Sequence, residues 1–457
     1  MELPRPGEAA ISSLAATRPG GSSPMARPTV GDPPNFGRPN RFGRDGATRP
    51  AMAALLAACL ALVGLVPGAW ASEEIRLGMS AGFHGPTRGL AVELYRGAMA
   101  YFEHVNAQGG VGGKKVVLLA VNDDYDPLPA IENTIQLVAQ DVLCLFSYLG
   151  TPTVTRVLPL LKSYHTKDIF LFFPFTGAQP QREPPYDRFV FNLRASYRAE
   201  VKALVDALVR VGHTRVAVFY QADAYGRSGW DGARLALAAH DLEIVAEATY
   251  RRGTPFTESM RPQVAELQKG GPDAVISVGA YPACAAFIRD ARAAGLDVPI
   301  ANVSFVGSEL LLRVLLEEGQ ATGRDLTRGI INSQVAPSYE DVSLPAVRQY
   351  RRLMDSYGDK LPLDLVRGEY RPFRFSQVGL EGFLNAKVMV EVLRRMENPL
   401  DRRQLKAAAE GIHDLDIGIG EPVSFGPDNH EGLNRVFLTV VKNDQFVPLR
   451  DMSVFAK

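Results

Sequence analysis

This sequence has no net charge and contains few cysteine and tryptophan residues. Its 457 residues include 50 Lys plus Arg against 50 Asp plus Glu, with 3 Cys and 2 Trp. A chain without a basic excess lacks the electrostatic feature that nucleic-acid binding favours, so we expect no nucleic-acid partner. Cys144 lies in an apolar run and Cys284 at a loop–helix junction. Both are expected to be buried free thiols, without a disulfide.

Enzyme and cofactor motifs are missing as well. Gly109–Lys114 resembles a phosphate-binding loop, but Gln108 occupies the position of the first glycine and Lys115 that of the Ser or Thr. The aspartates at 123, 124 and 126 lack the glycine and the distant glutamate of a calcium-binding loop. The seven histidines form no His-Glu-x-x-His motif. We therefore expect no cofactor, no metal ion and no catalytic residue.

One long run, Ala51–Ala71, carries no charge. Arginines precede it, and it ends in Ala69-Trp70-Ala71, with small residues at the two positions that signal peptidase reads. We predict that residues 51–71 are a signal peptide, cleaved between Ala71 and Ser72. The chain is therefore expected to be exported to the periplasm.

Two other interpretations of this region are less favoured. The apolar core, Ala51–Val66, is shorter than the roughly 20 residues that a membrane-spanning helix needs. Cys59 follows Leu-Ala-Ala, as in a lipoprotein cleavage box, but apolar residues continue well beyond it, so a lipid-anchored form is the minority interpretation. Residues 1–50, rich in Pro and Arg, have no apolar periodicity. They are expected to be a disordered extension or the result of a start assigned too early.

The mature chain is organised around residues 98–127. Apolar residues at helical spacing up to Val105 predict a helix, and Gly109 and Gly110 predict its end. A continuous apolar run at 116–121 then predicts a strand covered on both faces. Asp126 is expected to cap the helix that follows. This order is typical of a helix that returns to a parallel strand.

Strand–helix alternation of this kind occurs in two successive parts of the chain. The first alternation runs to about residue 193 and the second from 194 to 333, with longer helices and short strands after that. We predict an α/β protein with two doubly wound parallel-sheet lobes. Two such lobes usually enclose a ligand cleft at the carboxyl ends of their strands.

The predicted strand ends carry residues suited to binding. Thr151 and Thr153 flank a proline where a helix is expected to begin, so hydroxyls and free N–H groups there suit an anion. Residues 176–178 offer a hydroxyl and close backbone in Thr176, Gly177 and Ala178. Tyr225 and Tyr281 each combine an apolar ring with a hydrogen-bonding hydroxyl. The alternative is that all of these are turn residues and core tyrosines.

Several of these motifs resemble a known family. Gly-Gly-Val-x-Gly at 109–113 is followed by a predicted strand and by Asp-Asp-Tyr-Asp-Pro at 123–127. Tyr225-Gly226 and the segment Phe287–Leu296 are similar to second-lobe elements of the same family. From about residue 73 to 457 the chain resembles the periplasmic type I solute-binding proteins of the branched-chain amino acid (Leu/Ile/Val) class, which serve ABC importers.

The resemblance implies three crossovers between the lobes. Lobe 1 would comprise 72–193 plus about 334–403, and lobe 2 would comprise 194–333 plus about 404–457. The ligand would lie between them, the protein would be a monomer, and its partner would be an ABC permease in the inner membrane. By the same resemblance, Thr151 and Thr153 hold a carboxylate, residues 176–178 adjoin it, and Tyr225 and Tyr281 contact the ligand from lobe 2.

The chain also departs from that family. Ser304 stands near the position of the acid that holds a ligand ammonium, and a buried ammonium without a carboxylate would be costly. His84 and Arg88 follow the first strand, where Arg88 can add positive charge for an anion. The expected ligand is a branched-chain amino acid-like molecule, an amide or an organic acid. A ligand-sensing module for a receptor or kinase stays as an alternative, and an enzyme that uses the cleft is the less favoured one.

Overall fold

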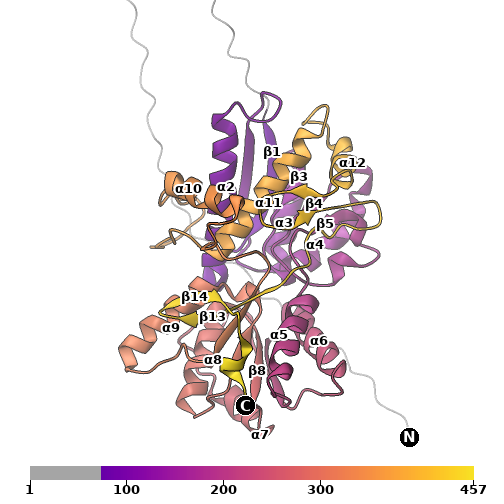
Figure 1. Ribbon diagram of the computed structural model, residues 1–457. Coiled ribbons are helices and arrows are strands. Elements are labelled where there is room, and N and C mark those ends of the chain that lie inside the picture. The colour runs from indigo at the N-terminus through magenta and orange to yellow at the C-terminus, as the bar shows by residue number, and fades with distance from the viewer. Residues whose placement is uncertain (1–73) are drawn as a thin grey trace, which may run out of the picture. The chain divides into compact units, whose positions relative to one another are not determined.

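The structure is a computed structural model that describes residues 74–457. The predicted extension, signal peptide, cleavage site and Cys59 lie outside the described residues. The described residues belong to one compact unit. Its two larger sheets have the strand orders β2-β1-β3-β4-β5 and β14-β13-β10-β9-β8-β6-β7. In Figure 1 the first sheet lies in the upper part of this unit and the second in the lower part.

The first sheet is parallel throughout and has β3 as its central strand. Most residues of its inner strands are apolar and buried because helices cover both faces of such a sheet. The edge strand at residues 116–122 is mostly half-buried, so the predicted cover of both its faces is incomplete. The strands are β1 (Ile75–Ala81), β2 (Val116–Asn122), β3 (Cys144–Phe146), β4 (Leu171–Phe172) and β5 (Val190–Phe191). The helices that connect them are α2 (Arg88–Ala107), α3 (Pro127–Ala139) and α4 (Thr151–Ser163).

The second sheet has five parallel strands and an antiparallel hairpin at one edge. The strands are β6 (Val216–Gln221), β7 (Glu247–Tyr250), β8 (Ala274–Val278), β9 (Ile300–Asn302), β10 (Ile330–Gln334), β13 (Phe437–Lys442) and β14 (Gln445–Pro448). The helices are α5 (Tyr197–Arg210), α6 (Ala224–Ala238), α7 (Arg261–Lys269), α8 (Tyr281–Ala293) and α9 (Ser308–Thr322). The predicted class, two doubly wound α/β lobes, is confirmed.

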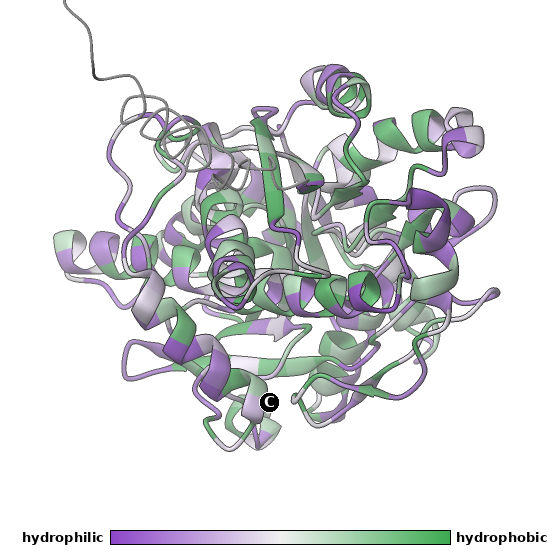
Figure 2. Ribbon diagram, turned by 90° about the horizontal axis from the view of Figure 1, so that it is seen from above, coloured by the Kyte–Doolittle hydropathy of each residue, from purple (hydrophilic) through white to green (hydrophobic). Residues whose placement is uncertain are grey.

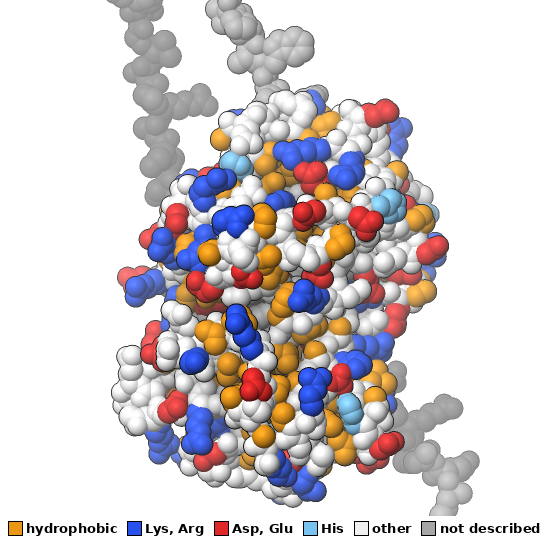
Figure 3. Space-filling view, in the orientation of Figure 1, with side chains coloured by type: hydrophobic (Ala, Val, Ile, Leu, Met, Phe, Trp, Pro, Cys, Tyr) orange, Lys and Arg blue, Asp and Glu red, His pale blue; other side chains and the backbone are white. Residues whose placement is uncertain are grey.

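The distribution of hydropathy explains why this arrangement is stable. Figure 2 shows mainly hydrophobic residues along the strands, and hydrophobic and hydrophilic residues in alternation along the surrounding helices. Such helices bury one apolar face against a sheet and leave the other in water. On the face seen in Figure 3, Lys and Arg are interspersed with Asp and Glu, as expected for a chain without net charge.

The glycine-rich stretch has the structure that its sequence predicts. Helix α2 ends at Ala107, and Gly109 and Gly110 adopt positive φ angles of 99° and 77°. Asp126 caps α3, because its Oδ1 accepts a hydrogen bond from the N–H of Leu128 at 2.9 Å. Thr87 directly precedes α2 and is a residue type that suits a helix cap, but its hydroxyl makes no cap and donates to the carbonyl of Gly82 instead.

The last third of the chain contributes to both lobes. Helix α11 (Gln377–Arg394) packs on α2, and α12 (Leu405–Glu410) packs on α11. Phe425 lies 6.1 Å from Phe173 and 5.6 Å from Phe191, which belong to lobe 1. Other elements here are α10 (Pro345–Tyr357) and the two-stranded sheet of β11 (Leu415–Asp416) and β12 (Pro422–Val423). Because the segment to Phe425 contacts lobe 1, we propose the second boundary near residue 434 in place of 403.

Candidate functional site

Two threonines from neighbouring strand ends meet in lobe 1. Thr151 follows β3 and Thr176 follows β4, and these strands pair in parallel. Their hydroxyl oxygens lie 2.6 Å apart, and both side chains are fully buried. Thr151 is also the first residue of α4, whose first N–H groups have no partner within the helix. The pair therefore lies beside a helix terminus that favours anions.

Thr153 and the 176–178 segment make hydrogen bonds mainly to other groups of the protein. The Thr153 hydroxyl donates to the carbonyls of Leu149 at 2.7 Å and Gly150 at 2.9 Å, so it fixes the first turn of α4. The carbonyl of Gly177 accepts a hydrogen bond of 2.7 Å from the N–H of Tyr197. A Cβ at Gly177 would come within 2.7 Å of that nitrogen, so the close approach requires glycine. The N–H of Ala178 donates to the Thr176 hydroxyl at 3.2 Å.

Aromatic rings from both lobes form one buried layer. The ring of Phe305 lies 5.5 Å from Phe175 and 6.1 Å from Tyr125, which both belong to lobe 1. On the lobe 2 side, Tyr225 lies 4.7 Å from Phe305 and 5.2 Å from Tyr197. None of the five side chains is more than 1% exposed. We call these residues the aromatic layer, and they would surround the apolar part of a ligand between the lobes.

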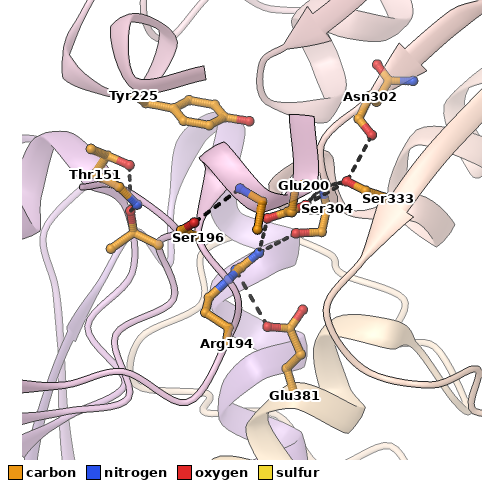
Figure 4. A network of polar contacts seen from close by, with 12 residues as sticks. Thr151, Arg194, Ser196, Glu200, Tyr225, Asn302, Ser304, Ser333 and Glu381 are labelled. Carbon is orange, nitrogen blue, oxygen red and sulfur yellow. Dashed lines mark hydrogen bonds and ion pairs between the residues drawn. The ribbon is translucent and has the colours of Figure 1, made fainter. Parts of the chain in front are cut away.

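A buried arginine connects the crossover to both lobes (Figure 4). Arg194 lies after β5, where the chain passes from lobe 1 to lobe 2. Its Nη2 donates to Oε1 of Glu200 at 3.3 Å and to the hydroxyl of Ser304. Its Nη1 lies 3.5 Å from Oε2 of Glu381 on α11. The guanidinium also lies 4.6 Å from the centre of the Phe175 ring, so it borders the aromatic layer.

The predicted residue Ser304 belongs to this network. Its N–H donates to Oε2 of Glu200 at 2.8 Å, and the same oxygen accepts from the hydroxyl of Ser333 at 2.6 Å. Both oxygens of Glu200 are therefore partnered. The side chain next to the Ser304 hydroxyl is therefore the Arg194 guanidinium and not a free carboxylate.

Two buried carboxyls near the interface have altered acidity. Burial raises the pKa of Glu381 to about 7, against the opposing effect of Arg194. Burial likewise raises the pKa of Asp123 to about 7, against the hydrogen bond of 2.7 Å that the Ser80 hydroxyl donates. Asp123 directly follows β2, and Glu381 lies in α11. With a pKa of about 7, each carboxyl gains or loses its proton near neutral pH.

Several buried polar atoms in this region make no hydrogen bond. They are Nε and Nη1 of Arg194, the hydroxyl of Tyr197 and Oε1 of Glu381. The hydroxyls of Thr151 and Thr176 lie close enough to that of Tyr197 to lower its pKa against the larger effect of burial, but the Tyr197 hydroxyl makes no hydrogen bond of standard geometry. Buried polar groups are nearly always partnered in native proteins, so such a group requires an explanation. A polar ligand between the lobes would supply partners.

The other predicted residues have partners elsewhere. Nδ1 of His84 lies 3.0 Å from Oδ1 of Asp124. Nη1 of Arg88 donates to the carbonyl of Arg367 at 3.0 Å, and its guanidinium lies 5.5 Å from the centre of the Tyr370 ring. These bonds anchor both residues within lobe 1.

Tyr281 reaches across the lobe interface. It begins α8 in lobe 2 and is half-buried. Burial raises its pKa, whereas the nearby Arg88 and the backbone of Gly89 in lobe 1 lower it. The structure thus places Tyr281 with Arg88 rather than with the Thr151–Thr176 pair.

Sequence reasoning missed Arg194, Tyr197, Glu200, Phe305 and Glu381. Arg194 lies between β5 and the N-cap of α5 at Ser196. Its position in the sequence indicates a crossover between the lobes but does not indicate where its side chain points. Glu381 is a charged residue within an otherwise apolar stretch of α11, and that is a recognisable signal of a buried polar contact. Phe305 follows Ser304 directly.

Comparison with known proteins identifies the group to which this chain is related. The sequence profile of the periplasmic binding protein family matches residues 74–445. The chain belongs to the periplasmic binding protein family.

Relatives within this family agree on its class. A Leu/Ile/Val-binding protein of Citrobacter freundii is 25% identical over 264 residues, which cover 58% of this chain and 68% of that protein. The crystal structure of a possible leucine/isoleucine/valine-binding protein from Rhodopirellula baltica SH 1 is 31% identical, covers 83% of this chain and 96% of its own, and has a TM-score of 0.73. A substrate-binding periplasmic protein from Ralstonia solanacearum is 28% identical, covers 82% of this chain and all of its own (100%), and has a TM-score of 0.72. The resemblance to the Leu/Ile/Val class is confirmed, and these relatives are binding proteins.

Residues 74–457 of this periplasmic binding protein contain neither a membrane-spanning helix nor a cluster of metal-binding side chains. No helix in that range has the length and apolar character to span a bilayer. Nor do the His, Cys, Asp and Glu residues of that range assemble in groups of three or more that would hold a metal ion. Cys144 and Cys284 are both buried, in β3 and α8 respectively.

Proposed function

We propose that this chain is the extracytoplasmic solute-binding component of an ABC importer and performs no catalysis. Its ligand would be a small polar or carboxylate molecule held between the two lobes. The observation that carries the proposal is the meeting of the Thr151–Thr176 pair of lobe 1 with Tyr197 and Tyr225 of lobe 2. Polar groups from one lobe and rings from the other suit a ligand with one charged end and one apolar end.

The contacts between the lobes suit a closure that ligand binding controls. Nε2 of Gln221 in lobe 2 donates to the Tyr125 hydroxyl of lobe 1 at 3.3 Å. Arg252 of lobe 2 lies 3.5 Å from Asp126 of lobe 1. These are single polar contacts, each worth about 1 kcal/mol or less. Hinge motion at the crossovers would separate these two polar contacts at small cost but would also expose the aromatic layer, and a bound ligand would favour the closed form.

Export and partnership follow from the same proposal. The signal peptide predicted at 51–71 would deliver the mature chain to the periplasm, where periplasmic relatives work. The closed, liganded form would then bind an ABC permease in the inner membrane as a monomer. Mixed charges on the face in Figure 3 suit a protein that stays dissolved and binds its partner transiently.

Ligand identification provides the direct test. The purified protein is denatured, the released small molecules are identified by mass spectrometry, and candidates are then assayed by thermal shift. A ligand that binds the native state raises the melting temperature with concentration. A released small acid or amino acid that stabilises the protein supports the proposal. Turnover of that molecule by the protein would contradict it.

A further inference from the structure

We propose that the interlobe site selects carboxylic acids without an α-amino group, and 2-oxo acids in particular, over the matching α-amino acids. This inference rests on the proposed binding function and specifies its ligand class. It follows from the charges and unpartnered atoms around Ser304, Arg194 and Tyr197.

The charged group that contacts the Ser304 side chain is the Arg194 guanidinium, which is paired with Glu200 and Glu381. An α-ammonium requires carboxylates or other acceptors, since it can only donate. Here the Ser304 hydroxyl accepts from Arg194, and the Ser304 N–H donates to Glu200. An ammonium at this end would therefore meet guanidinium N–H groups, which donate and cannot accept a hydrogen bond. An oxo group is uncharged and accepts, so it suits the same place.

Glu200 cannot substitute as the ammonium partner. Its two oxygens already accept from Arg194, the Ser304 N–H and the Ser333 hydroxyl, at 3.3, 2.8 and 2.6 Å. Its side chain is fully buried beneath these groups. Recruiting it for a ligand would break the contacts that hold the loop after β9 against α5.

Glu381 is the other carboxyl of the network. Its Oε2 lies 3.5 Å from Nη1 of Arg194, which is its ion-pair partner. Because burial raises its pKa to about 7, this side chain is protonated in much of the population at neutral pH. A protonated carboxyl is itself a donor through one oxygen and a weaker partner for an ammonium.

Apart from Oε1 of Glu381, the unpartnered polar atoms here belong to groups that can donate. Nε and Nη1 of Arg194 make no hydrogen bond, and the Tyr197 hydroxyl makes none either. The guanidinium lies 5.9 Å from the centre of the Tyr197 ring, so the two groups border one region. Thr151 and Thr176 close that region from lobe 1 and suit the carboxylate. A 2-oxo acid supplies acceptor atoms at both places, whereas an amino acid supplies three donors at one of them.

Matched ligand pairs test the inference directly. Calorimetry on the purified protein compares 4-methyl-2-oxopentanoate with leucine, and phenylpyruvate with phenylalanine. We expect at least tenfold tighter binding of one oxo acid than of its amino acid partner. Equal or tighter binding of the amino acids overturns the inference and leaves the proposed function standing. Failure of all four to bind a folded protein overturns the inference and counts against small-acid binding altogether.

A conservative variant separates recognition from structure. Tyr197→Phe removes a hydroxyl without breaking a hydrogen bond of the protein, so the fold should persist. We expect the oxo-to-amino selectivity ratio to fall several-fold in this variant. Tyr148→Phe is the control, because that hydroxyl bonds to Thr134 within lobe 1 at 3.1 Å, away from the interface. An unchanged oxo-to-amino selectivity ratio in Tyr197→Phe would contradict the role of this hydroxyl. A fall of the same size in Tyr148→Phe would also contradict it, because the effect would then come from a general loss of stability.

Discussion

The hydroxyl oxygens of Thr151 and Thr176 lie 2.6 Å apart, although 25 positions separate the two residues in the chain. Parallel pairing of β3 and β4 brings them together, because both strands end at the same edge of the sheet. Each hydroxyl can turn from its neighbour to a ligand at little cost. This pair is therefore the first place to test the site.

Thr151→Val should abolish the rise in melting temperature that the ligand causes in the wild type. The change keeps the shape of the side chain but leaves Thr176 with one partner fewer, which costs about 1 kcal/mol of stability. Thr155→Val is the matched control, since that hydroxyl donates to the Thr151 carbonyl within α4 at 2.8 Å. Full ligand-induced stabilisation in Thr151→Val would remove the threonine pair from the site.

Tyr125→Phe should shift the lobes toward the open form. It removes the hydrogen bond that Gln221 donates across the interface at 3.3 Å, a contact worth about 1 kcal/mol. We expect about fivefold weaker ligand binding, since closure and binding are coupled. Small-angle scattering without ligand should show a larger radius of gyration. An unchanged radius and affinity would show that this contact does not hold the closed form.

Stability should fall as pH rises through neutrality. The folded-state pKa of Glu381 is raised from 4.5 to about 7, and that of Asp123 from 3.8 to about 7. The folded chain thus binds these protons more tightly than the unfolded chain. Their contribution is fully present below the unfolded pKa values and is lost as pH rises through 7.

Urea unfolding at pH 5 and pH 7.5 measures this effect. Each such group adds a slope of up to about 1.4 kcal/mol per pH unit within that window. Glu381→Gln should reduce the difference between the two pH values, because glutamine does not titrate. Glu132→Gln, at an exposed position of α3, is the control and should leave the difference unchanged. The same slope in wild type and Glu381→Gln would contradict the assignment.

Two glycines of the signature stretch should differ in their tolerance of alanine. Gly110 and Gly113 share a φ of 77°, which strains any residue with a Cβ. At Gly110 that Cβ would also lie 2.0 Å from the carbonyl oxygen of Lys114, whereas nothing lies within 4 Å at Gly113. Gly113→Ala should cost about 1 kcal/mol, and Gly110→Ala considerably more. Equal losses in chemical denaturation would show that backbone conformation alone sets the cost.

Local signals in the sequence identified the fold. The turn at Gly109–Gly110, the cap at Asp126 and the buried strand runs all act over a few residues, so their pattern is visible in one dimension. Thr87 shows the limit of this approach. The residue type suits a cap, but the nearby carbonyl of Gly82 accepts its hydroxyl instead.

The binding residues could be predicted only in part. Thr151 and Thr176 were visible because they follow apolar runs that end at one sheet edge. Thr153 has the same residue type and the same loop, yet its hydroxyl turns back to Leu149 and Gly150. Which hydroxyl stays available depends on side-chain rotamers and first-turn geometry, which spacing does not encode.

The sequence by itself determined the class, the alternation of strands and helices and the edge of each sheet where a ligand would bind. Only the tertiary structure decided the electrostatics of that edge. Arg194, Glu200, Ser304 and Glu381 come from a crossover, a helix start, a strand-end loop and a helix of the other lobe. Their contacts span up to 187 positions, and long-range packing of this kind depends on the whole fold rather than on any local pattern.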